Sequence, residues 1–117
     1  MSFNWVEYVK LAEDLQKQRG ESYLRSSISR AYYGVFCIAR NKKGYKNSRQ
    51  SNVHWEVINA YKNSSIQDEK YVGKLLDDLR KQRNDADYDE DKTISAALAQ
   101  RVILKSKIIL KILGIPL

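Results

Sequence analysis

Residues that form tight turns are scarce in this chain, which holds one proline and five glycines among its 117 residues. Sandwiches and barrels join many short strands, and their joints need turn residues of this kind. The chain has too few of them for such a fold, so we expect an all-α protein. Its length favours a single domain over residues 1–117, with one hydrophobic core.

Apolar residues recur three and four positions apart through most of the chain, which is the spacing of one face of an α-helix. Asn4 and Glu7 resemble a capping box at the start of the first helix, and Gly20 and Gly44 bound the second. The expected helices span about 5–18, 21–42, a short stretch after Ser51 or Asn52, 67–86 and 93–113. Five helices with short connections predict an antiparallel up-and-down bundle.

The last expected helix is apolar around more than one narrow stripe. Two explanations are open: a partner covers one of its faces, or the helix lies at the centre of a small bundle. Its lysines at 105, 107 and 111 and its short apolar length argue against a membrane span. We expect no membrane role.

The formal net charge of +7 favours partners that are polyanions. The charge is uneven. Residues 40–49 hold five basic side chains and no acidic one, whereas residues 77–91 hold seven acidic side chains. Runs of charge are also typical of solvated surface, and this second reading stays open.

Cys37 is the only cysteine, so no intramolecular disulfide is possible, and no secretory leader opens the chain. A cytoplasmic protein is expected. One histidine and one cysteine fall short of a zinc site, and no phosphate-binding glycine loop or nucleophile elbow occurs. We therefore expect no metal and no cofactor. A nucleophilic pair of Cys37 with His54 is formally possible, but a buried inert thiol is favoured.

A dense polar set lies on the second and fourth expected helices. Its members are Ser29, Arg30, Tyr32, Tyr33, Arg80, Arg83, Asn84, Asp85, Asp87 and Tyr88. Carboxylates match guanidinium groups well, so Asp85 or Asp87 is expected to hold Arg30 and Arg83 in a polar latch between the helices. A functional site is the alternative to this structural network of Ser29, Asp85 and Asp87.

The run SRAYYGVF at residues 29–36 and the run RNDADY at residues 83–88 resemble the HEPN domain family (higher eukaryotes and prokaryotes nucleotide-binding). They are most similar to its small stand-alone bacterial and archaeal branch, and the resemblance covers nearly the whole chain. It implies a helical bundle that forms a homodimer around a shared cleft. Many members are metal-independent endoribonucleases. They are often toxins paired with a minimal nucleotidyltransferase antitoxin, or parts of RNA-targeting defence systems.

The catalytic motif of that family is an arginine, four to six residues and a histidine. Arg83 and Asn84 match its start, but Tyr88 stands in place of the histidine. Cleavage by a ribose 2′-hydroxyl needs a base, an acid and a cation near the phosphate, and Arg83 suits the last role. Tyrosine, with a pKa of about 10, is a poor base at neutral pH. His54 is then the candidate for the missing imidazole, or it has a structural role beside Trp55.

The favoured prediction is a module that binds RNA or a nucleotide, with a nucleotidyltransferase partner in a toxin–antitoxin or defence system. One alternative is an endoribonuclease with Arg83, Asn84, Tyr88 and His54 as its catalytic residues, and another is a non-catalytic dimeric scaffold. Tyr45 and Trp55 are suited to stack on bases. The expected binding residues are Arg30, Tyr33, Arg80, Lys42, Lys43, Lys46 and Arg49.

Overall fold

The computed structural model describes residues 2–48 and 51–117, and all secondary structure in them is helical. This confirms the all-α prediction. The helices are α1 (Val6–Gln16), α2 (Glu21–Lys42), α3 (Val53–Lys62), α4 (Gln67–Tyr88) and α5 (Ala96–Ile112). Their ends lie within about three residues of the positions that the periodicity predicts. The start of α5 is set by Ser95, whose hydroxyl accepts a hydrogen bond from the Leu98 amide at 3.1 Å.

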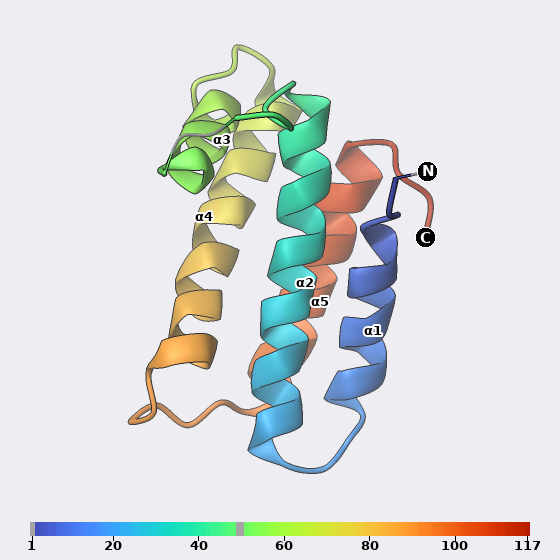
Figure 1. The fold of residues 1–117 in the computed structure, drawn as a ribbon, viewed down its shortest axis with the longest axis vertical. Helices are drawn as coiled ribbons and strands as arrows, with labels where there is room; N and C mark the ends of the chain where they lie inside the picture. The colour runs from blue at the N-terminus through green and yellow to red at the C-terminus, as the bar shows by residue number, and fades with distance from the viewer. Residues whose placement is uncertain (1, 49–50) are drawn as a thin grey trace.

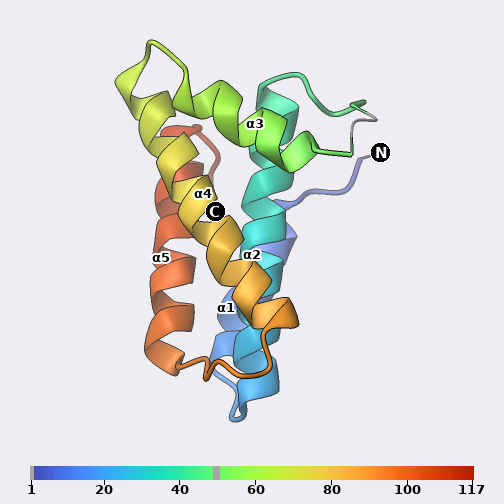
Figure 2. The same cartoon turned by 90° about the vertical axis from the view of Figure 1, so that its left-hand side faces the viewer.

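Four long helices, α1, α2, α4 and α5, alternate in direction along the chain and form an antiparallel bundle (Figure 1). The short helix α3 differs from them, because it crosses one end of the bundle between α2 and α4 (Figure 2). It buries Val57, Ile58 and Tyr61 against them. The Tyr61 hydroxyl donates to the carbonyl oxygen of Ala39 on α2 at 2.9 Å and so ties α3 to the bundle.

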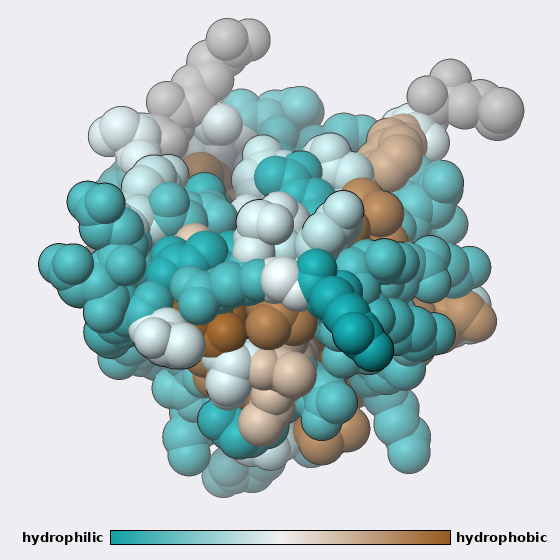
Figure 3. Space-filling model, turned by 90° about the horizontal axis from the view of Figure 1, so that it is seen from below, coloured by the Kyte–Doolittle hydropathy of each residue, from teal (hydrophilic) through white to brown (hydrophobic). Residues whose placement is uncertain are grey.

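Helix α2 is the central helix, with half of its 22 residues buried. It packs against all four other helices. Helix α5 buries a single face and leaves Leu104 59% exposed, so it does not occupy the centre of the bundle. Seen from the end that carries the α1–α2 and α4–α5 connections, the surface is mostly hydrophilic, with apolar patches between polar side chains (Figure 3). Among the described residues, none of the helices combines the length and the apolar character that crossing a membrane requires.

The C-terminal end of α4 is held by one side chain from the start of α2. Arg25 donates to the carbonyl oxygens of Asp85 at 3.3 Å and Ala86 at 3.0 Å, and also to that of Lys92. The last carbonyls of a helix lack partners within the helix and carry partial negative charge, so a guanidinium group suits them. Arg25 therefore fixes the end of α4 against α2.

Helices α3 and α4 approach each other most closely at Gly73. A Cβ atom placed there would lie 2.5 Å from the backbone nitrogen of Lys62 and 3.0 Å from its Cα. Backbone atoms cannot turn away as a flexible side chain can, so only glycine fits at this position. Gly34, where α2 meets α1, leaves slightly more space, with a nearest distance of 3.0 Å to the carbonyl oxygen of Trp5.

The substitution Gly73→Ala is expected to destabilise the protein by about 1–3 kcal/mol, because overpacking outweighs the better helix propensity of alanine. Gly34→Ala is the matched control, and its cost should be smaller because its contacts are less severe. Urea unfolding of the three proteins measures both effects. Equal stability of Gly73→Ala and the unaltered protein would contradict the close approach of α3 and α4.

Candidate functional site

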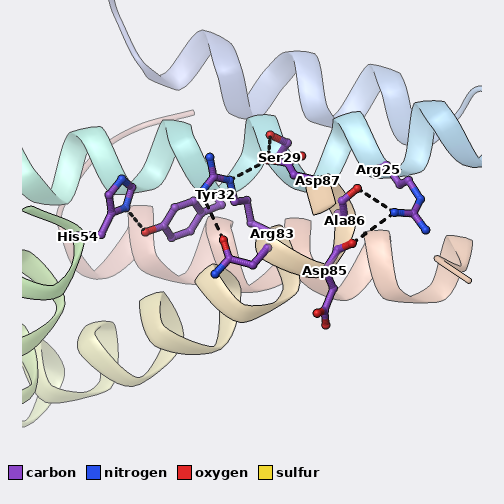
Figure 4. Close-up of polar contacts among 9 residues, drawn as sticks. Arg25, Ser29, Tyr32, His54, Arg83, Asp85, Ala86 and Asp87 are labelled. Atoms are coloured by element: carbon purple, nitrogen blue, oxygen red, sulfur yellow. Dashed lines mark hydrogen bonds and ion pairs between the residues drawn. The ribbon is translucent and has the colours of Figure 1, made fainter. Parts of the chain in front are cut away.

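Polar side chains meet along the contact between α2 and α4, which we call the α2–α4 seam (Figure 4). Residues 29, 32, 36 and 40 fall on one stripe of α2, and residues 80, 83 and 87 fall on one stripe of α4. Helix α3 crosses the seam at one end and contributes His54. The seam is formed by Ser29, Tyr32, Phe36, Arg40, His54, Arg80, Arg83 and Asp87.

A polar latch joins the two helices in the middle of the seam. The Arg83 Nε donates to Asp87 Oδ2 at 2.8 Å, and the Ser29 hydroxyl donates to the same oxygen at 3.1 Å. The side chains of Arg83 and Asp87 each remain 23% exposed. The latch expected from the sequence is therefore present in part, and its guanidinium group still reaches solvent.

Two residues expected in that latch lie elsewhere. The guanidinium group of Arg30 lies over the ring of Tyr8, 5.0 Å from its centroid, so it faces α1. Asp85 forms an ion pair with Lys92 at 2.9 Å. Each residue of a helix is turned by about 100° from the residue before it. Arg30 therefore lies on a different side of α2 from Ser29. In the same way, Asp85 lies on a different side of α4 from Asp87.

His54 and Tyr32 form a second polar pair at the α3 end of the seam. The Tyr32 oxygen lies 2.6 Å from His54 Nδ1, and the His54 ring stacks on Phe36 with centroids 4.0 Å apart. Burial, together with the positive charge of Arg80, Arg83 and Arg40, lowers the pKa of His54 to about 4. Burial also raises the pKa of Tyr32. At neutral pH both groups are therefore uncharged and share one hydrogen bond, whose direction is set by the ring nitrogen that carries the imidazole proton.

This environment limits the chemistry of His54. A pKa of about 4 makes its imidazole a weak base, and the contact with Tyr32 engages Nδ1, so Nε2 is the ring nitrogen left for a ligand. The Cys37 side chain is fully buried, and burial raises the pKa of its thiol. A thiol in this state is a poor nucleophile, which agrees with the structural reading of Cys37.

The seam carries more arginine side chains than carboxylates that pair with them. Three guanidinium groups, those of Arg40, Arg80 and Arg83, lie close enough to His54 to lower its pKa. Arg83 is paired with Asp87, and Arg40 Nε donates to the neutral side chain of Asn41 at 3.1 Å. No carboxylate of the described residues lies within ion-pair distance of Arg80. The seam can therefore accept an anion beside Arg80.

Tyr88 lies at the opposite end of the seam from His54. It is the last residue of α4, its side chain is 74% exposed, and the Arg83 guanidinium lies 5.7 Å from its ring centroid. A hollow of about 410 Å³ adjoins it, lined by Glu21, Arg25, Ala86, Asp87, Tyr88 and Glu90. Tyr32 and Arg83 stand between His54 and this end (Figure 4). Arg83 thus lies near both His54 and Tyr88, but His54 and Tyr88 do not lie near each other.

The remaining predicted binding residues lie around the α3 end of the molecule or against α1. Lys43 pairs with Glu69 at 2.7 Å and lies over the Tyr61 ring, so it stabilises the fold. Lys42 and Lys46 are exposed, and Trp55 is 58% exposed. Tyr45 and Tyr33 are half-buried, and Tyr33 packs edge-on against Trp5. Arg49 lies outside the described residues.

Two residues of this region, Arg25 and Arg40, lie outside the site that the sequence predicts, and a third, Tyr32, is predicted without its partner. Arg25 was not singled out, although it lies four residues before Ser29 on the same face of α2. Arg40 was counted with the basic loop, although its position belongs to the stripe that starts at Ser29. Tyr32 was noted among the polar residues without its partner, because the contact with His54 spans 22 residues.

A comparison of the chain with models of protein families, with curated proteins and with solved structures finds no match. Within residues 2–48 and 51–117, no group of three or more histidine, cysteine, aspartate or glutamate side chains is arranged to hold a metal ion.

Lowering the pH from 7 toward 4 is expected to destabilise the fold through His54. The pKa of His54 is about 4 in the folded protein, whereas an imidazole in an unfolded chain has a pKa of about 6.5. The unfolded state therefore binds more protons below pH 6.5, and the free energy of unfolding falls as the pH decreases. Urea unfolding at a series of pH values between 7 and 5, where most carboxylates stay ionised, measures this decrease.

The matched variant is His54→Asn, which keeps an acceptor for the Tyr32 hydroxyl. His54 is the only histidine of the chain, so the variant should flatten the pH dependence in this range. The same slope in both proteins would show that His54 is not held neutral by the fold.

Proposed function

We propose that this protein binds RNA or a nucleotide, with a phosphate group held at the α2–α4 seam between Arg40, Arg80 and Arg83. The observation that carries the proposal is that the charges of three guanidinium groups act on one neutral imidazole, whereas a carboxylate, Asp87, is paired with Arg83 alone. Guanidinium groups match phosphate oxygens with two parallel hydrogen bonds, and this geometry makes arginine the preferred residue at phosphate sites. With its proton on Nε2, His54 would also donate to a bound phosphate.

The surroundings of the seam favour a nucleic acid over a small inorganic anion. Exposed Lys42 and Lys46 follow Arg40 in the chain and extend the positive surface beyond the seam. Trp55, next to His54 on α3, is exposed and offers a face on which a base can stack. The formal net charge of +7 would speed the approach of a polyanion.

The resemblance to HEPN domains adds a biological setting to the proposal. Arg83 and Asn84, which match the start of that family's motif, lie on α4 at the seam, and the Asn84 side chain accepts a bond from Arg83 at 3.4 Å. On this basis the protein is a HEPN-type binding module that forms a homodimer. It would work beside a minimal nucleotidyltransferase in a toxin–antitoxin or defence system.

RNA cleavage without a metal ion is the second candidate function. The contact of Arg83 with the Tyr88 ring favours it, because both groups can then approach one phosphate. Binding is the better supported of the two, since His54 and Tyr88 lie at opposite ends of the seam and the Nδ1 of His54 is already engaged. The other alternative, a dimeric scaffold that binds no ligand, gives no role to the positive charge around Arg80.

The substitution Arg80→Ala tests the phosphate site, because no carboxylate among the described residues pairs with Arg80 and would lose a partner. Loss of a charge-assisted contact of about 1.5–3 kcal/mol should weaken binding of single-stranded RNA roughly 10- to 100-fold. It should also reduce the slope of log affinity against log salt concentration by about one. Fluorescence anisotropy with labelled RNA at several salt concentrations in EDTA measures both quantities.

Arg101→Ala is the matched control, since Arg101 is an exposed arginine on α5, outside the seam. It should leave the affinity nearly unchanged. Equal losses in the two variants would mean that RNA binds through net charge alone and would remove the seam from the site. Gel analysis of the same samples separates the two candidate functions, because cleavage that disappears in Arg83→Ala establishes the nuclease.

A further inference from the structure

A second hollow lies on another side of the bundle, between α1 and α5. Its volume is about 230 Å³, and it is lined by Glu13, Gln16, Gln100, Ile103, Leu104 and Lys107. None of these residues belongs to the α2–α4 seam. We call this feature the α1–α5 groove.

The groove has an apolar centre that water contacts directly. Leu104 is 59% exposed, whereas the neighbouring Ile103 is only 7% exposed and forms part of the core. A large aliphatic side chain beside a hollow of this size offers apolar area that another aliphatic or aromatic side chain can bury, at about 25 cal/mol per Å². The groove can therefore hold an apolar anchor residue.

The lining of the groove holds one acidic and one basic side chain, and exposed lysines flank it. Glu13 is bound to Lys107 across the groove at 2.8 Å, so its charge is compensated. Lys10 and Lys17 lie about one turn to either side of Glu13, and Lys111 lies one turn beyond Lys107. All three lysines are exposed, and no carboxylate in the part of the chain that the structure describes lies within ion-pair distance of them. Helix α5 itself contains no aspartate or glutamate.

Charge and shape together select one kind of occupant. A second copy of the chain would place the lysines and arginine of two α5 helices against each other, and like charges at an interface oppose association. A nucleic acid would meet the lysines but leave the aliphatic centre of the groove unused. A polypeptide segment with carboxylates around an apolar side chain satisfies both features.

We propose that the α1–α5 groove binds an acidic, amphipathic segment of another protein, with one apolar side chain inserted against Ile103 and Leu104 and carboxylates placed on Lys10, Lys17 and Lys111. This site is separate from the phosphate site and does not depend on it. Binding here buries the exposed part of Leu104 and compensates three lysine charges.

The test is a selection of helix-forming peptides from a displayed library whose surface positions vary among glutamate, lysine, leucine, phenylalanine, alanine and serine. The full-length protein is the target. Enriched peptides should be acidic and carry an apolar residue on one stripe, and their affinity should fall as the salt concentration rises. Leu104→Glu should weaken their binding roughly tenfold or more, because loss of an anchor residue costs over about 1 kcal/mol.

Charge-reversal variants test the proposal independently, because they do not alter the apolar centre of the groove. Lys10→Glu and Lys111→Glu should each weaken the selected peptides, whereas Lys74→Glu, an exposed site on α4, should not. Circular dichroism establishes that each variant is folded. RNA binding should be the same in Leu104→Glu and the unaltered protein, so failure of this proposal is distinguishable from failure of the phosphate site.

Three results would overturn the proposal. The first is a selection that yields no peptide able to distinguish the unaltered protein from Leu104→Glu, or that enriches peptides without an acidic excess. The second is a dimer in sedimentation equilibrium that Leu104→Glu dissociates, which assigns the groove to a second copy. The third is weaker RNA binding in Lys10→Glu and Lys111→Glu without an effect on peptides, which assigns it to nucleic acid.

Discussion

The Tyr32 hydroxyl lies inside the bundle, and a buried hydroxyl without a hydrogen-bond partner would be costly. Its partner is His54 Nδ1, and this one contact determines much of the region around it. It joins α3 to α2, and it engages Nδ1, so Nε2 is the ring nitrogen left for a ligand. Because the imidazole is neutral, arginines can gather around it without opposing a charge on His54 itself. The candidate phosphate site therefore depends on the need of a core tyrosine for a partner.

The two proposed sites use different physical principles on different sides of one small bundle. In the α2–α4 seam, guanidinium groups lie around the rigid, hydrogen-bonded pair of Tyr32 and His54. This arrangement suits an anion of fixed geometry. The α1–α5 groove combines an aliphatic centre with flexible lysines, which suits a segment that adapts its side chains. Both sites adjoin helices that pack on α2, whose burial in the centre of the fold holds them at constant separation.

The periodicity of apolar residues predicts the existence, order and approximate ends of all five helices, because each helix buries one face. It could not predict that α3 crosses the end of the bundle, since a period defines a face but not the direction of the axis. The partners of charged residues were predicted less well for a related reason. Asp85 and Asp87 differ by two positions, and this rotation of about 200° decides which of them meets Arg83 and which meets Lys92. The pairing of Tyr32 with His54 depends on tertiary packing, which no local pattern encodes.

The contacts of Arg25 with the carbonyl oxygens of Asp85 and Ala86 join residues 60 and 61 positions apart in the chain. During synthesis α2 emerges long before the last turn of α4. The carbonyl oxygens that accept from Arg25 are therefore present only after about three quarters of the chain is made. The last turn of α4 therefore needs α2 in place before its final carbonyl groups find this partner. Its opening is likewise coupled to α2. The segment RNDADY thus becomes ordered as part of the global folding step, and a truncated chain that ends within α4 would display its arginines without the arrangement described above.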